Sequence, residues 1–141
     1  MNATDGPLNR PLPIVFAVSR GIQQLTDGSL NILSVYDRLN VMQMPDGTRA
    51  ETVTLQVACC WTGGNGAFTQ VLRFLDADGH QIAEQQTDFT LPDVVHRHWV
   101  IALVTIPSTD GVYTIAVGRS DQELLRQSFT IGTMIAPGTA P

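Results

Sequence analysis

Two histidines one residue apart, His96 and His98, come closer to a metal site in type and spacing than any other residues in this sequence. On a β-strand both side chains would point to the same face, about 6.5–7 Å apart, which suits a shared metal ion. A site needs a third ligand, and His80, next to Asp78 in a predicted turn, is the candidate. The alternative is that the two histidines begin a core strand at its exposed end. We favour this alternative and expect no metal and no other cofactor.

The residues after the histidines read as a strand that is covered on both faces. We expect Trp99, Ile101 and Leu103 to enter the core, while Val100 and Ala102 continue the face of the histidines. Both sets are apolar, as in strands that are buried on two sides. The sequence therefore predicts that the later half of this strand has no solvated face.

The two cysteines, Cys59 and Cys60, are adjacent, so on a strand they point to opposite faces and cannot easily form a disulfide. Cys59 shares its face with Leu55, Val57 and Trp61, which predicts a small buried hydrophobe. Cys60 points the other way, and we expect it to be accessible. A reactive thiol needs a nearby cation or a helix N-terminus, and the linear sequence pairs Cys60 with neither.

Trp61 opens the Gly-rich stretch WTGGNGAF. This stretch lacks the Lys-Ser/Thr of a phosphate-binding loop and the helix that would follow it. Trp61 at its edge either stacks on a sugar or a partner's side chain, or closes one end of the core. We favour the core and keep ligand binding as the alternative.

The composition narrows the classes of function. A chain of 141 residues with 43% hydrophobic and 15% charged residues fits one globular domain. All eight basic residues are arginines, they are dispersed, and the net charge is -5. Binding to nucleic acid or to a membrane is therefore not expected. The N-terminal stretch lacks a basic segment followed by an apolar one, so we expect a cytoplasmic protein.

Turns and apolar runs predict an all-β fold. Asp-Gly pairs, which suit tight turns, separate runs rich in Val, Ile, Leu, Phe and Thr. The runs predict eight strands, at about 13–20, 29–36, 51–61, 68–76, 80–87, 96–106, 111–118 and 123–131. No segment shows a convincing helical period.

This pattern favours a single antiparallel β-sandwich of seven to nine strands with immunoglobulin-like Greek-key topology. We expect the domain to span residues 13–133, between flexible tails at 1–12 and 134–141. Tyr113, two residues after Gly111 at the start of a late strand, resembles the tyrosine corner of such sandwiches.

The stretch DGSLNILSVYDRLNVMQMP, residues 27–45, carries a resemblance to a family. It is similar to an uncharacterised bacterial family of small standalone β-sandwich proteins with a G-x-L-x-I-x-G-x-aromatic-D-R motif. Gly28, Leu30, Ile32, Asp37 and Arg38 match the motif, and Tyr36 takes the aromatic place; Ser34 replaces the second glycine. The likeness spans about residues 13–132. It implies a sandwich fold and a bacterial origin, and it assigns no activity.

The sequence favours a non-enzymatic module that binds a protein partner or associates with itself. The predicted contact surface lies in the connection at 36–45, in Tyr36, Asp37, Arg38, Met42 and Met44. The reason is that the two methionines and Val41 lie in a short connection poor in polar residues. The alternative is a sandwich that binds a small ligand, either a sugar through Trp61 or a metal through the histidines. An enzyme is least favoured, since no catalytic motif occurs.

Overall fold

The computed structural model describes residues 9–27, 30–35 and 38–138. Within these residues the chain forms nine β-strands and no helix. The strands are β1 (Leu12–Gln24), β2 (Leu30–Val35), β3 (Arg38–Gln43), β4 (Thr52–Thr62), β5 (Gly66–Leu75), β6 (Gln81–Leu91), β7 (His98–Pro107), β8 (Gly111–Arg119) and β9 (Gln122–Ile135). No helix long and apolar enough to cross a membrane occurs in this part of the chain.

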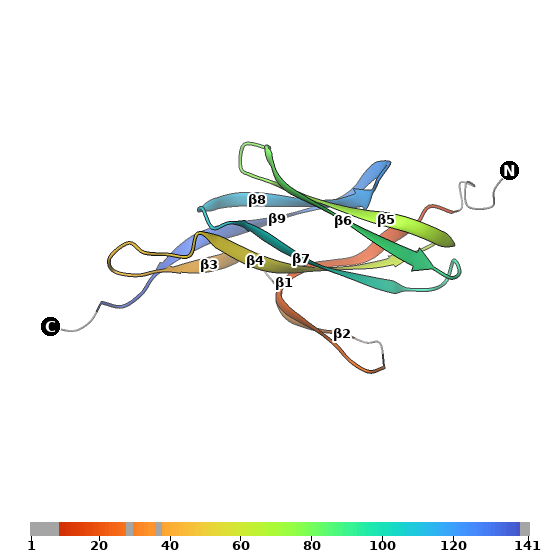
Figure 1. Cartoon of the computed structure of the whole chain (residues 1–141), viewed down its shortest axis with the longest axis horizontal. Helices are drawn as coiled ribbons and strands as arrows, with labels where there is room; N and C mark the ends of the chain where they lie inside the picture. Colours follow the sequence, from red (N-terminus) through yellow and green to blue (C-terminus); the bar gives the residue numbers. More distant parts are fainter. Residues whose placement is uncertain (1–8, 28–29, 36–37, 139–141) are drawn as a thin grey trace.

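The strands form two sheets that pack face to face (Figure 1). One sheet has the order β2-β1-β4-β7 and the other the order β3-β9-β8-β5-β6. Strands that follow one another in the chain, such as β4 and β5 or β7 and β8, belong to different sheets, so the chain crosses repeatedly between the layers. The predicted all-β, immunoglobulin-like sandwich is confirmed, and its nine described strands lie within the predicted number.

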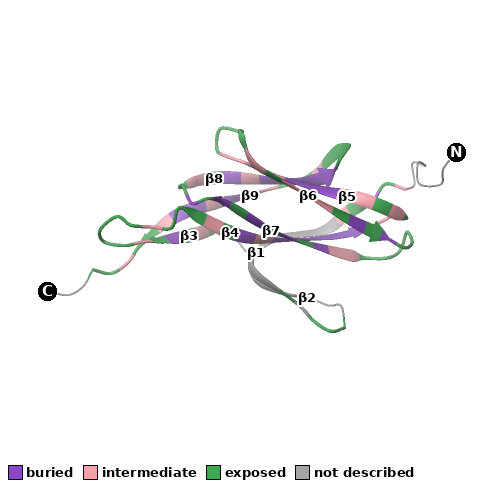
Figure 2. Ribbon diagram, in the orientation of Figure 1, coloured by how far each residue is buried: buried purple, intermediate pink, exposed green. Residues whose placement is uncertain are grey.

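The core lies between the two sheets and follows the alternation of the sequence (Figure 2). Every second residue of β4 points inward, and from Leu55 to Trp61 these residues are fully buried. The facing sheet supplies inward residues from β5, β8 and β9. The largest buried side chains in the described residues include Trp61, Phe74, Phe129, Leu55 and Leu72. Because inward positions are apolar and most outward ones polar, the pattern fixes which face of each strand is buried.

One strand was missed, and its direction differs from the prediction. Residues 38–43, predicted as part of a connection, form β3 and pair in parallel with β9, from Arg38 opposite Thr130 to Gln43 opposite Ile135. Val41 is buried, whereas Met42 is exposed. The sandwich is therefore not purely antiparallel. A six-residue strand gives too few alternations for the sequence to distinguish it from a loop.

The prediction for the faces of β7 is wrong. Val100, Ala102 and Val104 are buried in the core, whereas Ile101 is 38% exposed and Leu103 is 61% exposed. Both faces are apolar, so alternation alone cannot tell which one packs on the facing sheet. β7 is an edge strand, and its outer face is not covered by the described part of the chain.

The ends of the domain extend slightly beyond the predicted limits of 13 and 133. β1 begins at Leu12, and β9 continues to Ile135. Before β1, the Asn9 side chain donates a hydrogen bond to the backbone oxygen of Asn65 at 3.0 Å. This contact attaches residues near the N-terminus to the β4–β5 connection.

The tyrosine corner is present. The Tyr113 hydroxyl donates a hydrogen bond to the backbone oxygen of Thr109, four residues upstream, at 2.6 Å. Its ring stacks on Phe129 with the ring centroids 5.7 Å apart. This contact fixes the turn between β7 and β8 against the start of β8.

β1 leaves the body of its sheet after Ser19. Ser19 pairs with Gln56 of β4 on one side and with Val35 of β2 on the other, while residues 21–24 pair with β2. The β1–β2 hairpin consequently projects away from the two layers, as Figure 1 shows.

Candidate functional site

The structure separates His80 from the other two histidines. His80 directly precedes β6, and His96 lies in the loop that follows β6, so the eleven residues of this strand stand between them. A strand of that length spans about 35 Å. The rings of His96 and His98 are 6.1 Å apart, but only His98 belongs to β7. The alternative metal site of His80, His96 and His98 is therefore not formed.

Asp76, Asp78 and His80 do come together at the β5–β6 turn, with their ligand atoms within 4.8 Å of one another. Asp76 Oδ1 accepts the backbone N–H groups of Asp78 at 3.0 Å and His80 at 2.9 Å. Asp76 Oδ2 lies 3.7 Å from His80 Nδ1. These contacts close the hairpin at Gly79, whose φ is 82°. The three ligand atoms are fewer than calcium requires, and the hairpin accounts for the arrangement.

A pocket of about 320 Å³ lies between this turn and the β7–β8 turn. Asp76, Asp78 and Asp110 place three carboxyl groups around it, and Tyr113 forms part of its wall. Thr133 and Arg49 occupy the carboxylate oxygens of Asp110, so this group is already neutralised. The pocket favours cationic over anionic groups, and it offers no nucleophile paired with a base.

His98 sits half-buried at the start of β7, stacked on Phe89 with ring centroids 6.0 Å apart. Burial, and secondly the charge of His96, lower the pKa of His98 below its ordinary value of 6.5. The folded state thus favours the neutral ring. As the pH falls below about 6.5, His98 is protonated in the unfolded chain before it is protonated in the folded one. The free energy of unfolding therefore decreases until the pH falls below the pKa of His98 in the folded state.

We therefore expect the melting temperature to fall as the pH is lowered from 7 to 5, and His98→Gln to reduce this fall. His80→Gln, in the exposed turn, is the matched control. Thermal melting at half-unit pH steps measures the effect. An equally steep fall in His98→Gln would show that His98 does not cause it.

Trp61 is fully buried at the end of β4. Its ring lies 5.2 Å from that of Phe89, and its Nε1 donates to Gln70 Oε1 at 2.7 Å. The Gln70 Nε2 group has no hydrogen-bond partner within the described residues. Trp61 thus packs in the core, the interpretation that the sequence favours, and its ring cannot stack on a sugar in this conformation.

The prediction that Cys60 is accessible is wrong, because Cys60 is 2% exposed. It points to the outer face of its sheet, where Trp99 lies opposite it in the register. Burial raises the pKa of the Cys60 thiol, and the charge of Arg97 opposes this only in part. Burial also raises the pKa of Cys59. Neither cysteine has the properties of an activated nucleophile.

The methionines of the predicted contact surface are exposed. Met42 and Met134 lie directly opposite each other in the β3–β9 register and are 45% and 48% exposed. Met44, 49% exposed, continues the face of Met42, whereas Ile135, 69% exposed at the end of β9, points by alternation to the other face. We call these four residues the methionine surface. Single exposed apolar residues are ordinary, but four of them gathered at the end of one edge-strand pair are typical of a contact surface.

Arg38, Tyr36 and Asp37, the other residues of the predicted contact surface, are not part of the methionine surface. Arg38 lies on the outer face of β3, where its Nε donates to Asn40 Oδ1 at 3.0 Å. Both side chains lie over Gly132, where a Cβ atom would collide with them. Tyr36 and Asp37 fall outside the described residues, so their part in the predicted surface has no structural counterpart here.

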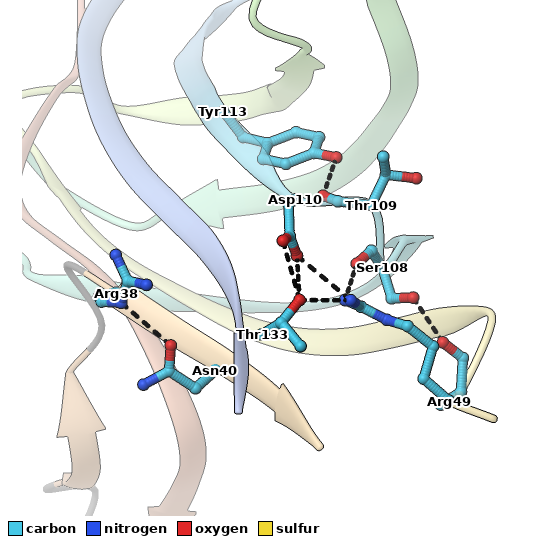
Figure 3. A network of polar contacts seen from close by, with 9 residues as sticks. Arg38, Asn40, Arg49, Ser108, Thr109, Asp110, Tyr113 and Thr133 are labelled. Carbon is cyan, nitrogen blue, oxygen red and sulfur yellow. Dashed lines mark hydrogen bonds and ion pairs between the residues drawn. The ribbon is translucent and has the colours of Figure 1, made fainter. Parts of the chain in front are cut away.

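A polar network holds the methionine surface in place (Figure 3). Arg49, in the β3–β4 connection, donates to Asp110 Oδ1 at 3.2 Å, to Thr133 Oγ1 at 2.6 Å and to the backbone oxygen of Ser108. The Thr133 hydroxyl is 2.8 Å from both carboxylate oxygens of Asp110, and its bond lowers the pKa of that carboxyl group. The network thereby joins the β3–β4 connection, the β7–β8 connection and β9 next to Met134, which follows Thr133 directly.

Two backbone contacts fix the other half of the surface. The Met44 N–H donates to Thr48 at 2.8 Å, and the Ala136 N–H donates to Gln43 at 2.8 Å. The first closes the turn after β3, and the second attaches the chain after β9 to β3. The methionine surface is therefore carried by ordered backbone, which lowers the entropic cost of binding.

The sequence did not identify Met134 and Ile135 as part of this surface, because residues 134–141 read as a tail. The parallel pairing of β3 with β9 brings them beside Met42. The only local signal in the sequence was that the strand-like alternation of side chains in β9 continues through Thr133 to Ile135, which indicates a longer strand. A pairing between segments about 90 residues apart is not visible in one sequence.

Comparisons with known proteins give a family and no function. The profile of a family described as a family of unknown function (DUF6941) matches residues 15–132. A search of curated proteins gave no significant match.

Three solved structures are similar to part or most of the chain. Two are of a glycosyl hydrolase family 2 member from Bacteroides cellulosilyticus, each with a TM-score of 0.48 and 16% identity over 59% of this chain. The chain spans only 13% and 12% of their length. The third, an immunoglobulin-like protein from Pseudomonas aeruginosa, has a TM-score of 0.43 and 12% identity, with 92% of this chain and 100% of that chain covered.

Proposed function

Because the chain belongs to the DUF6941 family of unknown function, we propose its function from its geometry: a non-enzymatic assembly module that associates with further copies of itself through the methionine surface. The observation that carries the proposal is the pairing of Met42 with Met134 across β3 and β9, both about half exposed. Methionine side chains are apolar and flexible, so they adapt to an opposing surface and lose water on contact.

The position of β3 supports the proposal. β3 is an edge strand of its sheet, so the methionine surface borders a strand whose outer side is unpaired in the described residues except at Gln43, which bridges Arg49. A two-fold axis beside this edge brings the same apolar residues of two copies together, which is the usual geometry of a homodimer. Burial of Met42, Met44, Met134 and Ile135 in both copies then supplies the binding energy.

The small-ligand alternative has less support. Trp61 is fully buried, and the three histidines do not converge. The dispersed arginines and the net charge of -5 further support a protein partner over nucleic acid or a membrane. A bacterial origin and a cytoplasmic location complete the proposal and rest on the sequence alone.

We expect Met42→Glu combined with Met134→Glu to reduce the solution mass at least twofold, because two charges per copy would be buried without partners. Multi-angle light scattering measures this mass. Leu125→Glu is the matched control, since Leu125 is 38% exposed on β9 but lies nine residues from Met134. An unchanged mass in the double variant would contradict this surface.

A further inference from the structure

β7 is an edge strand without the features that normally prevent edges from pairing. It runs for ten residues, from His98 to Pro107, and contains no Asp, Glu, Lys or Arg. Its register with β4 continues without a bulge from Thr52 to Trp61. Charges, bulges and brevity are the usual protections of an edge strand. β7 has none of them before its terminal proline.

The outer face of this sheet is apolar, and on β7 it is open at Ile101 and Leu103. Ala58 and Cys60 of β4 point outward and are 0% and 2% exposed, with Ile101 and Trp99 opposite them on β7. Leu103, two residues further, is 61% exposed. A solvated face of an antiparallel sheet is ordinarily polar. The run on β7 instead has the composition of a strand buried on both faces.

The strand beside β7 in the facing sheet is different. β6 is also an edge strand, but it carries Glu84 and Asp88. Glu84 pairs with Arg73, and Asp88 accepts a hydrogen bond from Thr69. Such charges oppose edge-to-edge pairing, particularly between copies of a chain with a net charge of -5. Of the two edge strands at this side of the sandwich, β7 is therefore the one along which two copies can pair without bringing carboxylates together.

Charges at the two ends of β7 complement each other across a two-fold axis. The exposed Arg97 directly precedes the strand. Glu51 lies at its other end, where its backbone oxygen accepts the Ser108 N–H at 3.0 Å. An antiparallel partner places Arg97 of one copy at the end that carries Glu51 of the other, twice by symmetry. Glu51 precedes β4, the neighbour of β7, so two strand spacings, about 10 Å, separate the two positions, which extended Arg and Glu side chains can span together.

We propose that a second copy of this chain pairs with β7 edge to edge and antiparallel, joining the two four-stranded sheets into one and burying Leu103 and Ile101 at the junction. The pairing supplies partners for the open N–H and C=O groups of β7 and covers its apolar outer row. The pairing involves the whole of β7, which places Arg97 of one copy opposite Ser108 of the other. This contact is separate from the methionine surface, which lies on the other sheet at β3.

Four proteins measured by sedimentation velocity at matched concentration separate the two contacts. With both contacts intact, the mass exceeds that of a dimer. Met42→Glu with Met134→Glu leaves a dimer joined through β7. Leu103→Glu leaves a dimer joined through the methionine surface. All three substitutions together give a monomer of 15.3 kDa.

Val112→Glu controls for an added charge, since Val112 is 50% exposed on the other sheet. Leu103→Glu is expected to weaken the β7 contact at least about tenfold, because the charge is desolvated at the junction. If Leu103→Glu leaves the mass unchanged, the β7 contact is wrong, whereas an unchanged mass in the methionine variant refutes only the proposed function.

A charge exchange tests the same contact without an apolar substitution. Arg97→Glu alone is expected to weaken the association, because two carboxylates then face each other across the contact. Arg97→Glu with Glu51→Arg is expected to restore it, because each contact again has one positive and one negative side chain. Circular dichroism checks that each variant is folded. Failure of the double exchange to recover the mass lost in Arg97→Glu would overturn the antiparallel arrangement.

Discussion

Trp61→Ala is expected to lower the free energy of unfolding by about 4 kcal/mol, the range for removing a large aromatic ring from a packed core. Trp61 is 0% exposed, lies against Phe89, and donates its only polar hydrogen to Gln70. The substitution leaves a cavity and removes the one hydrogen-bond partner of the Gln70 amide within the described residues. The melting temperature should fall by roughly 10–15 °C, which differential scanning calorimetry measures.

Two variants separate packing from hydrogen bonding at this position. Trp61→Phe keeps most of the apolar volume but leaves Gln70 unpaired, which costs about 1–3 kcal/mol. Trp99→Ala removes the other tryptophan, which is half-buried on the outer face, and should cost less than half as much as Trp61→Ala. Equal losses in Trp61→Ala and Trp99→Ala would contradict the placement of Trp61 in the core.

Arg49→Met should have the next largest effect, a loss of about 2 kcal/mol in the free energy of unfolding. Arg49 holds three groups: Asp110 and the backbone oxygen of Ser108 in the β7–β8 connection, and Thr133 in β9. Methionine keeps much of the aliphatic length but leaves these acceptors without their donor. Urea unfolding followed by circular dichroism measures the loss.

The matched control is Arg126→Met. Arg126 donates two hydrogen bonds to Glu123, but its side chain is 56% exposed. Exposed ion pairs contribute little to stability, so this variant should unfold almost like the wild type. Equal effects at Arg49 and Arg126 would show that the Arg49 network does not hold the connections together. Loss of self-association in Arg49→Met would further link this network to the methionine surface above it.

Much of the fold was predictable because its signals are local. Asp-Gly turns and alternating apolar residues on β4 identify the strands and the buried face. The Tyr113 hydroxyl bond follows from a short motif around Gly111. The faces of β7 were not predictable, because a strand that is apolar on both sides gives no alternation to read.

The site was predictable in part. Met42 and Met44 were identified because they lie, with Val41, in a short segment poor in polar residues; both are exposed, whereas Val41 is buried. Met134 and Ile135 depend on the parallel pairing of β3 with β9, which no local signal indicates. The same limit applied to Arg49, whose three partners come from distant segments. A sequence shows residue types along the chain, whereas a surface is made by long-range pairing.

The mass of the unmodified chain in solution tests the central claim most directly, namely that the chain assembles with itself through uncharged apolar surfaces. Light scattering over a hundredfold range of concentration is the measurement. We expect a mass that rises with concentration from twice the chain mass of 15.3 kDa to more than that of a dimer. A mass of 15.3 kDa at every concentration would contradict the account.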